Sequence, residues 1–79
     1  MGYEYLIEHH PNDPMAWNDF LAKLDNPCSL SGWPEFDVRI TADGIYFCDH
    51  GHTSTAAVAI RRIVDRAMGE ADSVTIREL

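Results

Sequence analysis

The chain has few cysteines, few basic residues and no long hydrophobic run. Its 79 residues include two cysteines, Cys28 and Cys48, too few for the disulfide framework of a small secreted domain. No apolar stretch approaches the roughly 20 residues of a membrane-spanning helix. The first five residues lack the basic and apolar segments of a signal peptide. We therefore expect a cytoplasmic protein with reduced thiols, folded as one domain over residues 1–79.

The shortage of basic residues is concentrated in one part of the chain. Thirteen acidic and six basic side chains give a net charge of −7, and residues 1–50 hold nine of the acidic and only two of the basic ones. Because nucleic-acid affinity depends on Lys and Arg neutralising phosphates, we expect no nucleic-acid partner, and nothing indicates a membrane. Opposite charge favours encounter, so the expected partner is a basic protein or a second copy of the chain.

What the sequence does contain is six segments of alternating hydrophobic period. Alternation with period two predicts strands near residues 3–8, 36–41, 45–50 and 73–77. Apolar spacing of three and four predicts helices from Pro14 to the Asn26-Pro27 pair and from Ser54 to Gly69. This order predicts an α+β, ferredoxin-like βαββαβ fold: a four-stranded antiparallel sheet of order 4-1-3-2 with both helices on one face.

Asp43-Gly44 is the strongest turn signal in the chain. As the two loop residues of a type I′ hairpin, they would bring Ala42 opposite Ile45 and Ile40 opposite Phe47. The core face of the hairpin would then carry Val38, Ile40, Ala42, Ile45 and Phe47.

One cluster has the composition of a metal site. Cys48 and His50 would point the same way from a strand, and His52 and Cys28 could complete four ligands of the kind that Zn²⁺ prefers. The spacing matches no zinc-finger pattern, so a half-buried thiol with two loop histidines is the simpler interpretation, and we expect no cofactor. His9 lies at the opposite end of the sheet, exposed at a strand end, and cannot join this cluster.

Two further sites can be considered. Thr53, Ser54 and Thr55 lie at the start of a helix whose free amides could bind an anion, although ordinary helix capping by Thr53 or Ser54 is the favoured explanation. Cys48 could act as a nucleophile, but a histidine base needs a third, orienting group. The only acidic residue close in sequence, Asp49, would point to the other face, so we assign no catalytic residue.

The sheet face opposite the helices offers a contact surface. Leu6 and Tyr46 would form an exposed apolar patch on it, flanked by charged residues, and the whole set comprises Glu4, Leu6, Glu8, Arg39, Tyr46 and Arg77. The leading hypothesis is a small, acidic, non-enzymatic protein-interaction domain of toxin-neutralising or regulatory type. The alternatives are a zinc-binding module at Cys28, Cys48, His50 and His52, and an anion-binding or catalytic site at the second helix N-terminus.

Overall fold

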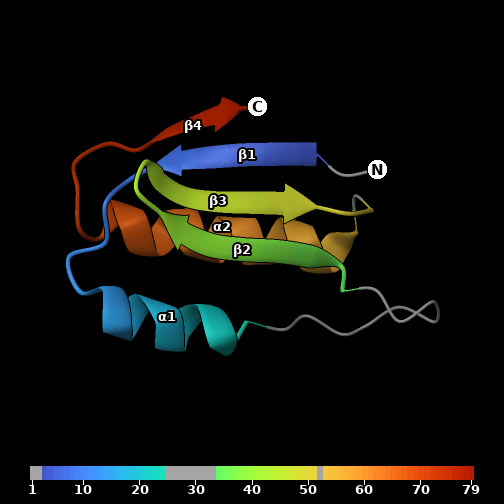
Figure 1. Cartoon of the computed structure of the whole chain (residues 1–79), viewed down its shortest axis with the longest axis horizontal. Coiled ribbons are helices and arrows are strands. Elements are labelled where there is room, and N and C mark those ends of the chain that lie inside the picture. Colours follow the sequence, from blue (N-terminus) through green and yellow to red (C-terminus); the bar gives the residue numbers. More distant parts are fainter. Residues whose placement is uncertain (1–2, 25–33, 52) are drawn as a thin grey trace.

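A computed structural model describes residues 3–24, 34–51 and 53–79 and contains the six expected elements (Figure 1). They are β1 (Tyr3–Glu8), α1 (Pro14–Ala22), β2 (Phe36–Thr41), β3 (Gly44–Asp49), α2 (Ser54–Met68) and β4 (Thr75–Glu78). The strands form one antiparallel sheet of order β2-β3-β1-β4, which confirms the ferredoxin-like prediction. Over the described ranges, no helix has the length and apolar content needed to cross a membrane.

Both helices begin at the capping residues that the sequence indicates. The Asp13 side chain accepts hydrogen bonds from the backbone N–H groups of Met15 and Ala16, and Pro14 occupies the first turn, where its missing N–H costs nothing. Thr53 caps α2 by accepting from the Ala56 N–H. Sequence patterns at helix starts are therefore reliable in this chain.

The helix ends differ from the prediction. Helix α1 ends at Ala22, before the Asn26-Pro27 pair, because the Lys23 N–H bonds to the Phe20 carbonyl in a tighter, 3₁₀-like last turn. Gly69 closes α2 with a φ of −73°, an ordinary right-handed value. The end of α2 does not depend on glycine's access to left-handed backbone.

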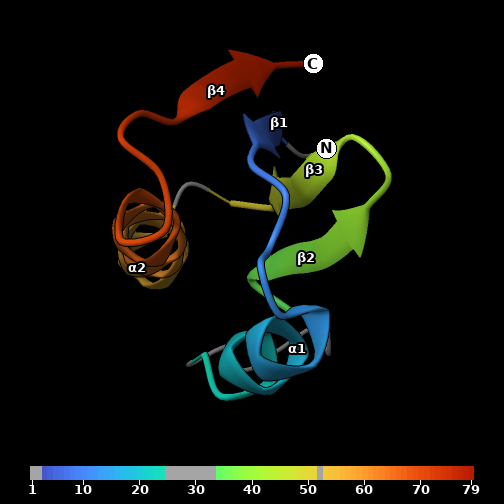
Figure 2. The same cartoon turned by 90° about the vertical axis from the view of Figure 1, so that its left-hand side faces the viewer.

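The core lies between one face of the sheet and the two helices. Figure 2 shows α2 beside the middle of the sheet and α1 beside β2. Phe36 and Phe47 stack at 5.1 Å between ring centroids, and Trp17 from α1 is fully buried in the same cluster. Helix α2 contributes mainly small residues and can therefore lie close to the sheet: Ala56, Ala59, Ile63 and Ala67.

The β2–β3 turn is one residue earlier than expected. Thr41 pairs with Gly44, so the loop residues are Ala42 and Asp43, and Val38 lies opposite Phe47. Gly44 adopts a φ of +142°, and a Cβ there would overlap the Ile7 carbonyl oxygen of β1. Glycine is needed at this position because β1 approaches too closely for any side chain, and so the turn lies just before it.

The new register keeps the same faces but changes the cross-strand partners. Because the shift along one strand is two residues, Val38, Ile40, Ile45 and Phe47 still face the core, and only Ala42 leaves it for the exposed turn. The predicted pairs of Ala42 with Ile45 and of Ile40 with Phe47 were wrong.

Glu70, just after α2, links the α2–β4 connection to the β1–α1 connection at one end of the sheet by hydrogen bonds. Its carboxylate accepts from the Trp17 indole N–H at 2.9 Å, from His9 Nε2 at 2.9 Å and from the Asn12 backbone N–H at 3.2 Å. The hydrogen bond from His9 is the main cause that holds the Glu70 pKa below its usual value, against the opposing effect of burial. His9 is only 8% exposed, so the expectation of an exposed histidine was wrong.

Replacing Gly44 with alanine tests the close approach of β1. We expect Gly44→Ala to lower the free energy of unfolding by roughly 2 kcal/mol or more, because both the positive φ and the overlap with the Ile7 oxygen oppose a Cβ. Urea unfolding measures the change. Gly51→Ala is the matched control, since a Cβ there meets only the Thr53 side chain at 3.6 Å. Equal effects of the two substitutions would contradict the packing argument.

Replacing Glu70 with glutamine tests the carboxylate at the other end. Because the folded-state pKa is lowered, its stabilisation is complete above the unfolded value of 4.5 and is lost as the pH falls through the folded value. At pH 7, Glu70→Gln should therefore cost about 2 kcal/mol, as for hydrogen bonds to a charged group. The difference from wild type should shrink toward pH 3 in urea titrations. Glu78→Gln, on exposed β4, serves as the control, and a pH-independent difference would refute the assignment.

Candidate functional site

The face of the sheet that neither helix covers carries all six residues predicted for the contact surface. Glu4, Leu6 and Glu8 alternate along β1 with the core residues Tyr5 and Ile7. Cross-strand pairing places Tyr46 and Arg77 beside Leu6, and Arg39 beside Tyr46. We call this surface the open face. The six residues therefore share one face, and their role as a contact surface stays a prediction.

The expected apolar patch on this face is not exposed. Leu6 is only 6% exposed, because its cross-strand neighbours, Tyr46 and Arg77, are long side chains that shield it. Arg77 also forms an ion pair with Glu8 at 3.5 Å. The open face is therefore a layer of polar and aromatic side chains over a buried leucine.

Tyr46 is held from two sides. Its hydroxyl donates a hydrogen bond to Glu4 Oε1 at 2.5 Å, and the Arg39 guanidinium lies 4.6 Å from the centre of its ring. The bond to Glu4 is the largest of the effects that raise the Tyr46 pKa well above its usual value, followed by desolvation and by the neighbouring Cys48. The phenol thus stays protonated and remains a hydrogen-bond donor at any physiological pH.

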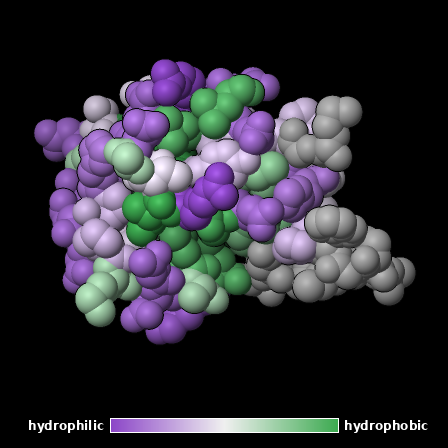
Figure 3. All heavy atoms as spheres, viewed as in Figure 1, coloured by the Kyte–Doolittle hydropathy of each residue, from purple (hydrophilic) through white to green (hydrophobic). Residues whose placement is uncertain are grey.

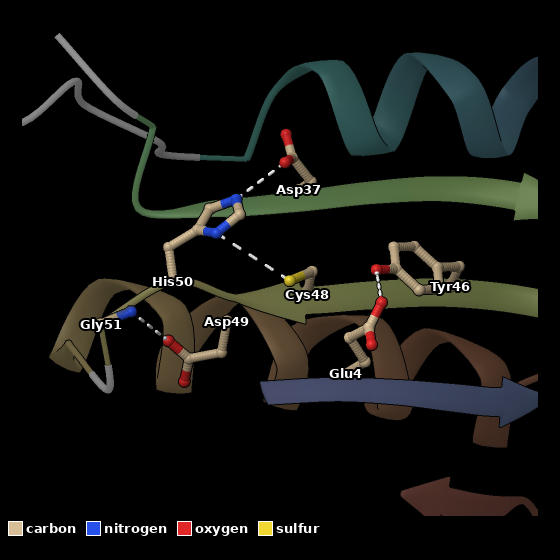
Figure 4. Close-up of polar contacts among 7 residues, drawn as sticks. All are labelled: Glu4, Asp37, Tyr46, Cys48, Asp49, His50 and Gly51. Carbon is tan, nitrogen blue, oxygen red and sulfur yellow. Dashed lines mark hydrogen bonds and ion pairs between the residues drawn. The ribbon is translucent and has the colours of Figure 1, made fainter. Parts of the chain in front are cut away.

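Next to Tyr46, three side chains form a chain of polar contacts (Figure 4). His50 Nε2 lies 2.7 Å from Asp37 Oδ2, and His50 Nδ1 lies 3.9 Å from Cys48 Sγ. Asp37 is exposed, His50 is 31% exposed at its side chain, and Cys48 is largely buried at 8%. A carboxylate from β2, an imidazole just beyond β3 and a thiol from the end of β3 therefore lie next to one another.

Backbone contacts fix the position of His50 just beyond β3. Its N–H donates to the Glu35 carbonyl at 3.1 Å and continues the pairing with the segment before β2. The Asp49 carboxylate accepts from the Gly51 N–H at 3.0 Å, which turns the chain after His50 (Figure 4). The imidazole is thus held over the open face and does not follow the loop away from it.

Asp37 is the residue that the sequence interpretation missed. With Asp43-Gly44 as the loop, Cys48 would lie opposite Arg39. In the observed register Cys48 lies opposite Asp37. Whether Cys48 pairs with Arg39 or with Asp37 depends only on the position of the turn. The packing of Gly44 against β1 determines that position.

The surface along β2 is hollowed in two places. One hollow, of about 380 Å³, is lined by Asp37, Val38, Arg39, Tyr46, Cys48 and His50. A second, of about 550 Å³, lies between α1 and β2 and is lined partly by Leu21, Val38, Arg39 and Ile40. Figure 3, which views the open face, shows hydrophobic residues between β2 and α1 and hydrophilic ones around them. Val38 and Arg39 line both hollows, which lie on either side of the edge strand β2.

The predicted zinc ligands can be compared only in part. Cys48 and His50 lie together as expected, whereas Cys28 and His52 fall outside the described residues. Within the ranges that the structure describes, no three His, Cys, Asp or Glu side chains are arranged to hold a metal ion. The zinc alternative stays a prediction.

The helix N-terminus proposed for an anion already faces a carboxylate. Thr53 Oγ1 donates to Glu35 Oε2 at 2.9 Å while capping α2, and Ser54 is exposed beside it. Thr55 lines a separate, smaller hollow with Arg62. A second anion near Thr53 would be repelled by Glu35, which argues against this alternative.

Titrating Tyr46 tests the polar layer of the open face. We expect its phenol to ionise well above the ordinary range for tyrosine, and Glu4→Gln to bring it back toward that range because the carboxylate acceptor is lost. The measurement is ultraviolet absorbance of tyrosinate against pH, with Tyr46→Phe identifying its signal among the three tyrosines. Glu78→Gln should change nothing. A Tyr46 that titrates with the other two would disprove the contact.

Comparison with known proteins gives no family for this chain, because no family profile, no curated protein and no solved structure matches it. The role of the open face has to be inferred from its own residues.

Proposed function

We propose that this chain is a small acidic protein-interaction domain that binds a basic protein through the open face of its sheet. A toxin-neutralising or regulatory protein would act in this way. The observation that carries the proposal is the pair of hollows along the edge strand β2, where half-buried Leu21, Val38 and Ile40 lie near the exposed Asp37 carboxylate at the border of the open face. An apolar area surrounded by a polar rim is typical of protein-binding surfaces.

The charges around this surface favour a basic partner. Glu4 and Glu8 on β1 and Asp37 on β2 are exposed, and they belong to the half of the chain that carries the whole net charge of −7. Their internal partners do not prevent binding: the exposed Arg77–Glu8 pair, at 3.5 Å, is worth little in water. A lysine or arginine of a partner can therefore replace Arg77 at small cost.

Arg39 and Tyr46 supply the remaining contacts expected of such a surface. The Arg39 guanidinium lies over the Tyr46 ring in the lining of the 380 Å³ hollow, so a partner would meet a pre-ordered aromatic–cation pair. Tyrosine and arginine are enriched where binding energy concentrates in protein interfaces. Little side-chain entropy would be lost there on binding.

A charge-matched comparison tests whether the open face does the binding. An oligolysine peptide is titrated into isotope-labelled protein, and amide shifts and affinity are followed by NMR at low salt. We expect shifts to concentrate in β1, β2 and β3. The double variant Glu4→Gln/Glu8→Gln should bind about tenfold more weakly, from two exposed ion pairs worth roughly 0.7 kcal/mol each.

The control removes the same charge from the helices. Asp19→Asn/Asp65→Asn leaves the open face intact and should weaken binding much less, since both residues are exposed on α1 and α2. Equal losses in the two double variants would mean that net charge alone matters and would refute the proposal. Sedimentation of the free protein measures whether it forms a dimer. A stable dimer that buries the open face would exclude a basic partner there and would also refute the proposal.

A further inference from the structure

We propose that Cys48 is a nucleophilic thiol, with His50 as its base and Asp37 as the residue that positions the base, and that it exchanges with positively charged disulfides. The inference rests on the polar chain at the end of β3 and on the hollow beside it. It does not depend on the proposed binding of a basic protein. The reaction is stoichiometric and leaves the disulfide on the chain.

Asp37 determines which nitrogen of His50 carries the proton. A carboxylate can only accept, so the 2.7 Å contact places the N–H on Nε2 and leaves the lone pair of the neutral ring on Nδ1. That lone pair lies 3.9 Å from the Cys48 sulfur. The distance is at the long end of a contact to sulfur, and such contacts shorten as a proton is transferred.

Access to the sulfur comes from the open face. Cys48 is 8% exposed, but it lines the hollow of about 380 Å³ that also borders His50 and Asp37. Because Cys48 points away from the core, a reagent can reach it without unfolding the sheet. The sheet thus restricts the thiol to one direction of approach.

The chemistry at hand fits disulfide exchange better than acyl transfer. Acyl transfer develops charge on an oxygen and needs a set of hydrogen-bond donors to stabilise it, whereas exchange keeps the charge on sulfur atoms. Cys48 lies between two acidic residues, Glu4 on β1 and Asp37 on β2. The donors near it are already engaged, the Tyr46 hydroxyl with Glu4 and the Arg39 guanidinium with the Tyr46 ring. Disulfide exchange, which needs no oxyanion stabilisation, therefore suits this site better.

The same two carboxylates select the charge of the disulfide. Glu4 pairs with Cys48 from one neighbouring strand and Asp37 from the other, and both are exposed. Arg39, which also lines the hollow, is a single positive charge against these two carboxylates, and its guanidinium lies 4.6 Å from the centre of the Tyr46 ring. A cationic disulfide is therefore attracted to the hollow and an anionic one is repelled.

The exchange conserves both atoms and electrons. The Cys48 thiol gives its proton to His50 Nδ1, and the thiolate attacks one sulfur of the incoming disulfide. A new S–S bond forms to Cys48, the old S–S bond breaks, and the departing half leaves as a thiolate that takes up a proton. Cys48 is oxidised and the departing half is reduced, so no other oxidant is needed.

Two probes of opposite charge test the proposal in a Cys28→Ser background, where Cys48 is the only thiol. Cystamine is the cationic disulfide and 5,5′-dithiobis(2-nitrobenzoate) the anionic one, and mass spectrometry of quenched samples gives both rates. Each rate is divided by that of the same chain unfolded in urea. We expect the ratio of cystamine to anionic-probe reactivity to be about tenfold higher in the folded chain.

Variants then test the base. At pH 7, His50→Gln should slow the reaction with cystamine about tenfold and Asp37→Asn about threefold, because general-base help is lost or misaligned. Both should approach the parent rate above about pH 10, where a thiol ionises unaided. A merely structural role would not give this convergence. His10→Gln and Asp43→Asn, both exposed and remote from the hollow, should leave the rates unchanged.

Two results would overturn the inference. If His50→Gln reacts at the parent rate at every pH, His50 is not the base. If the ratio of cystamine to anionic-probe reactivity is the same in the folded and the unfolded chain, the site does not select for positive charge. The probe ratio needs no substitution at the site, so it decides the matter even if His50→Gln does not fold. His50→Gln keeps Glu4 and Glu8 in place, and the binding test with oligolysine does not measure thiol reactivity, so the two proposals fail separately.

Discussion

The close approach of β1 to the turn between β2 and β3 governs which side chains can meet on the open face. Gly44 lies against the Ile7 carbonyl with a φ of +142°, and no other residue fits there. Strand β3 begins at this glycine, so the loop consists of Ala42 and Asp43. Every cross-strand pair of the hairpin follows from that choice, and the pairing of Asp37 with Cys48 is one of them. A backbone contact between neighbouring strands thus determines the chemistry on the open face.

The two ends of the sheet use similar side chains for different purposes. At one end, Glu70 accepts from His9 and from the indole of Trp17, and the imidazole is buried. At the other end, Asp37 accepts from His50, and both groups remain open to solvent. A buried pair with every partner supplied stabilises the connections between elements, because losing one partner would leave a polar group without water. An exposed pair contributes little stability, which leaves it available for a ligand or a proton.

The sequence predicts much of the fold because its signals are local. Period-two and helical spacing, together with Asp13 and Thr53 as caps, were enough for all six elements and for the order of the strands. The hairpin register was not accessible in this way. Asp43-Gly44 satisfies the preference of a two-residue turn, and the contact that overrides it comes from β1, far away in sequence. The burial of Leu6 was missed for a similar reason, since its cover comes from Tyr46 and Arg77 on two other strands.

That single error of register also hid the candidate site. With Arg39 opposite Cys48, a thiol beside a cation would have no carboxylate to orient His50, and the pair would seem incomplete. With Asp37 opposite Cys48, the orienting group is present, although no acidic residue close in sequence could supply it. Period-two alternation is enough to place residues on one face of the sheet, but which of them lie side by side depends on the pairing of the strands. Their individual chemistry was readable from the sequence, and their combination was not.

The acidity of the open face places opposite demands on a binding surface and on a reactive thiol. Carboxylates on both neighbouring strands attract a cationic partner, yet they also disfavour a negative charge on the sulfur between them. His50 resolves the conflict, because the proton that leaves Cys48 stays next to it as an imidazolium. That cation lies between the thiolate and Asp37, 2.7 Å from the carboxylate, so charge separation is compensated within the chain of three. A positively charged reagent adds compensation from the open side, whereas an anionic one removes it. The negative charge that would make a bare thiol unreactive here therefore becomes the basis of its selectivity.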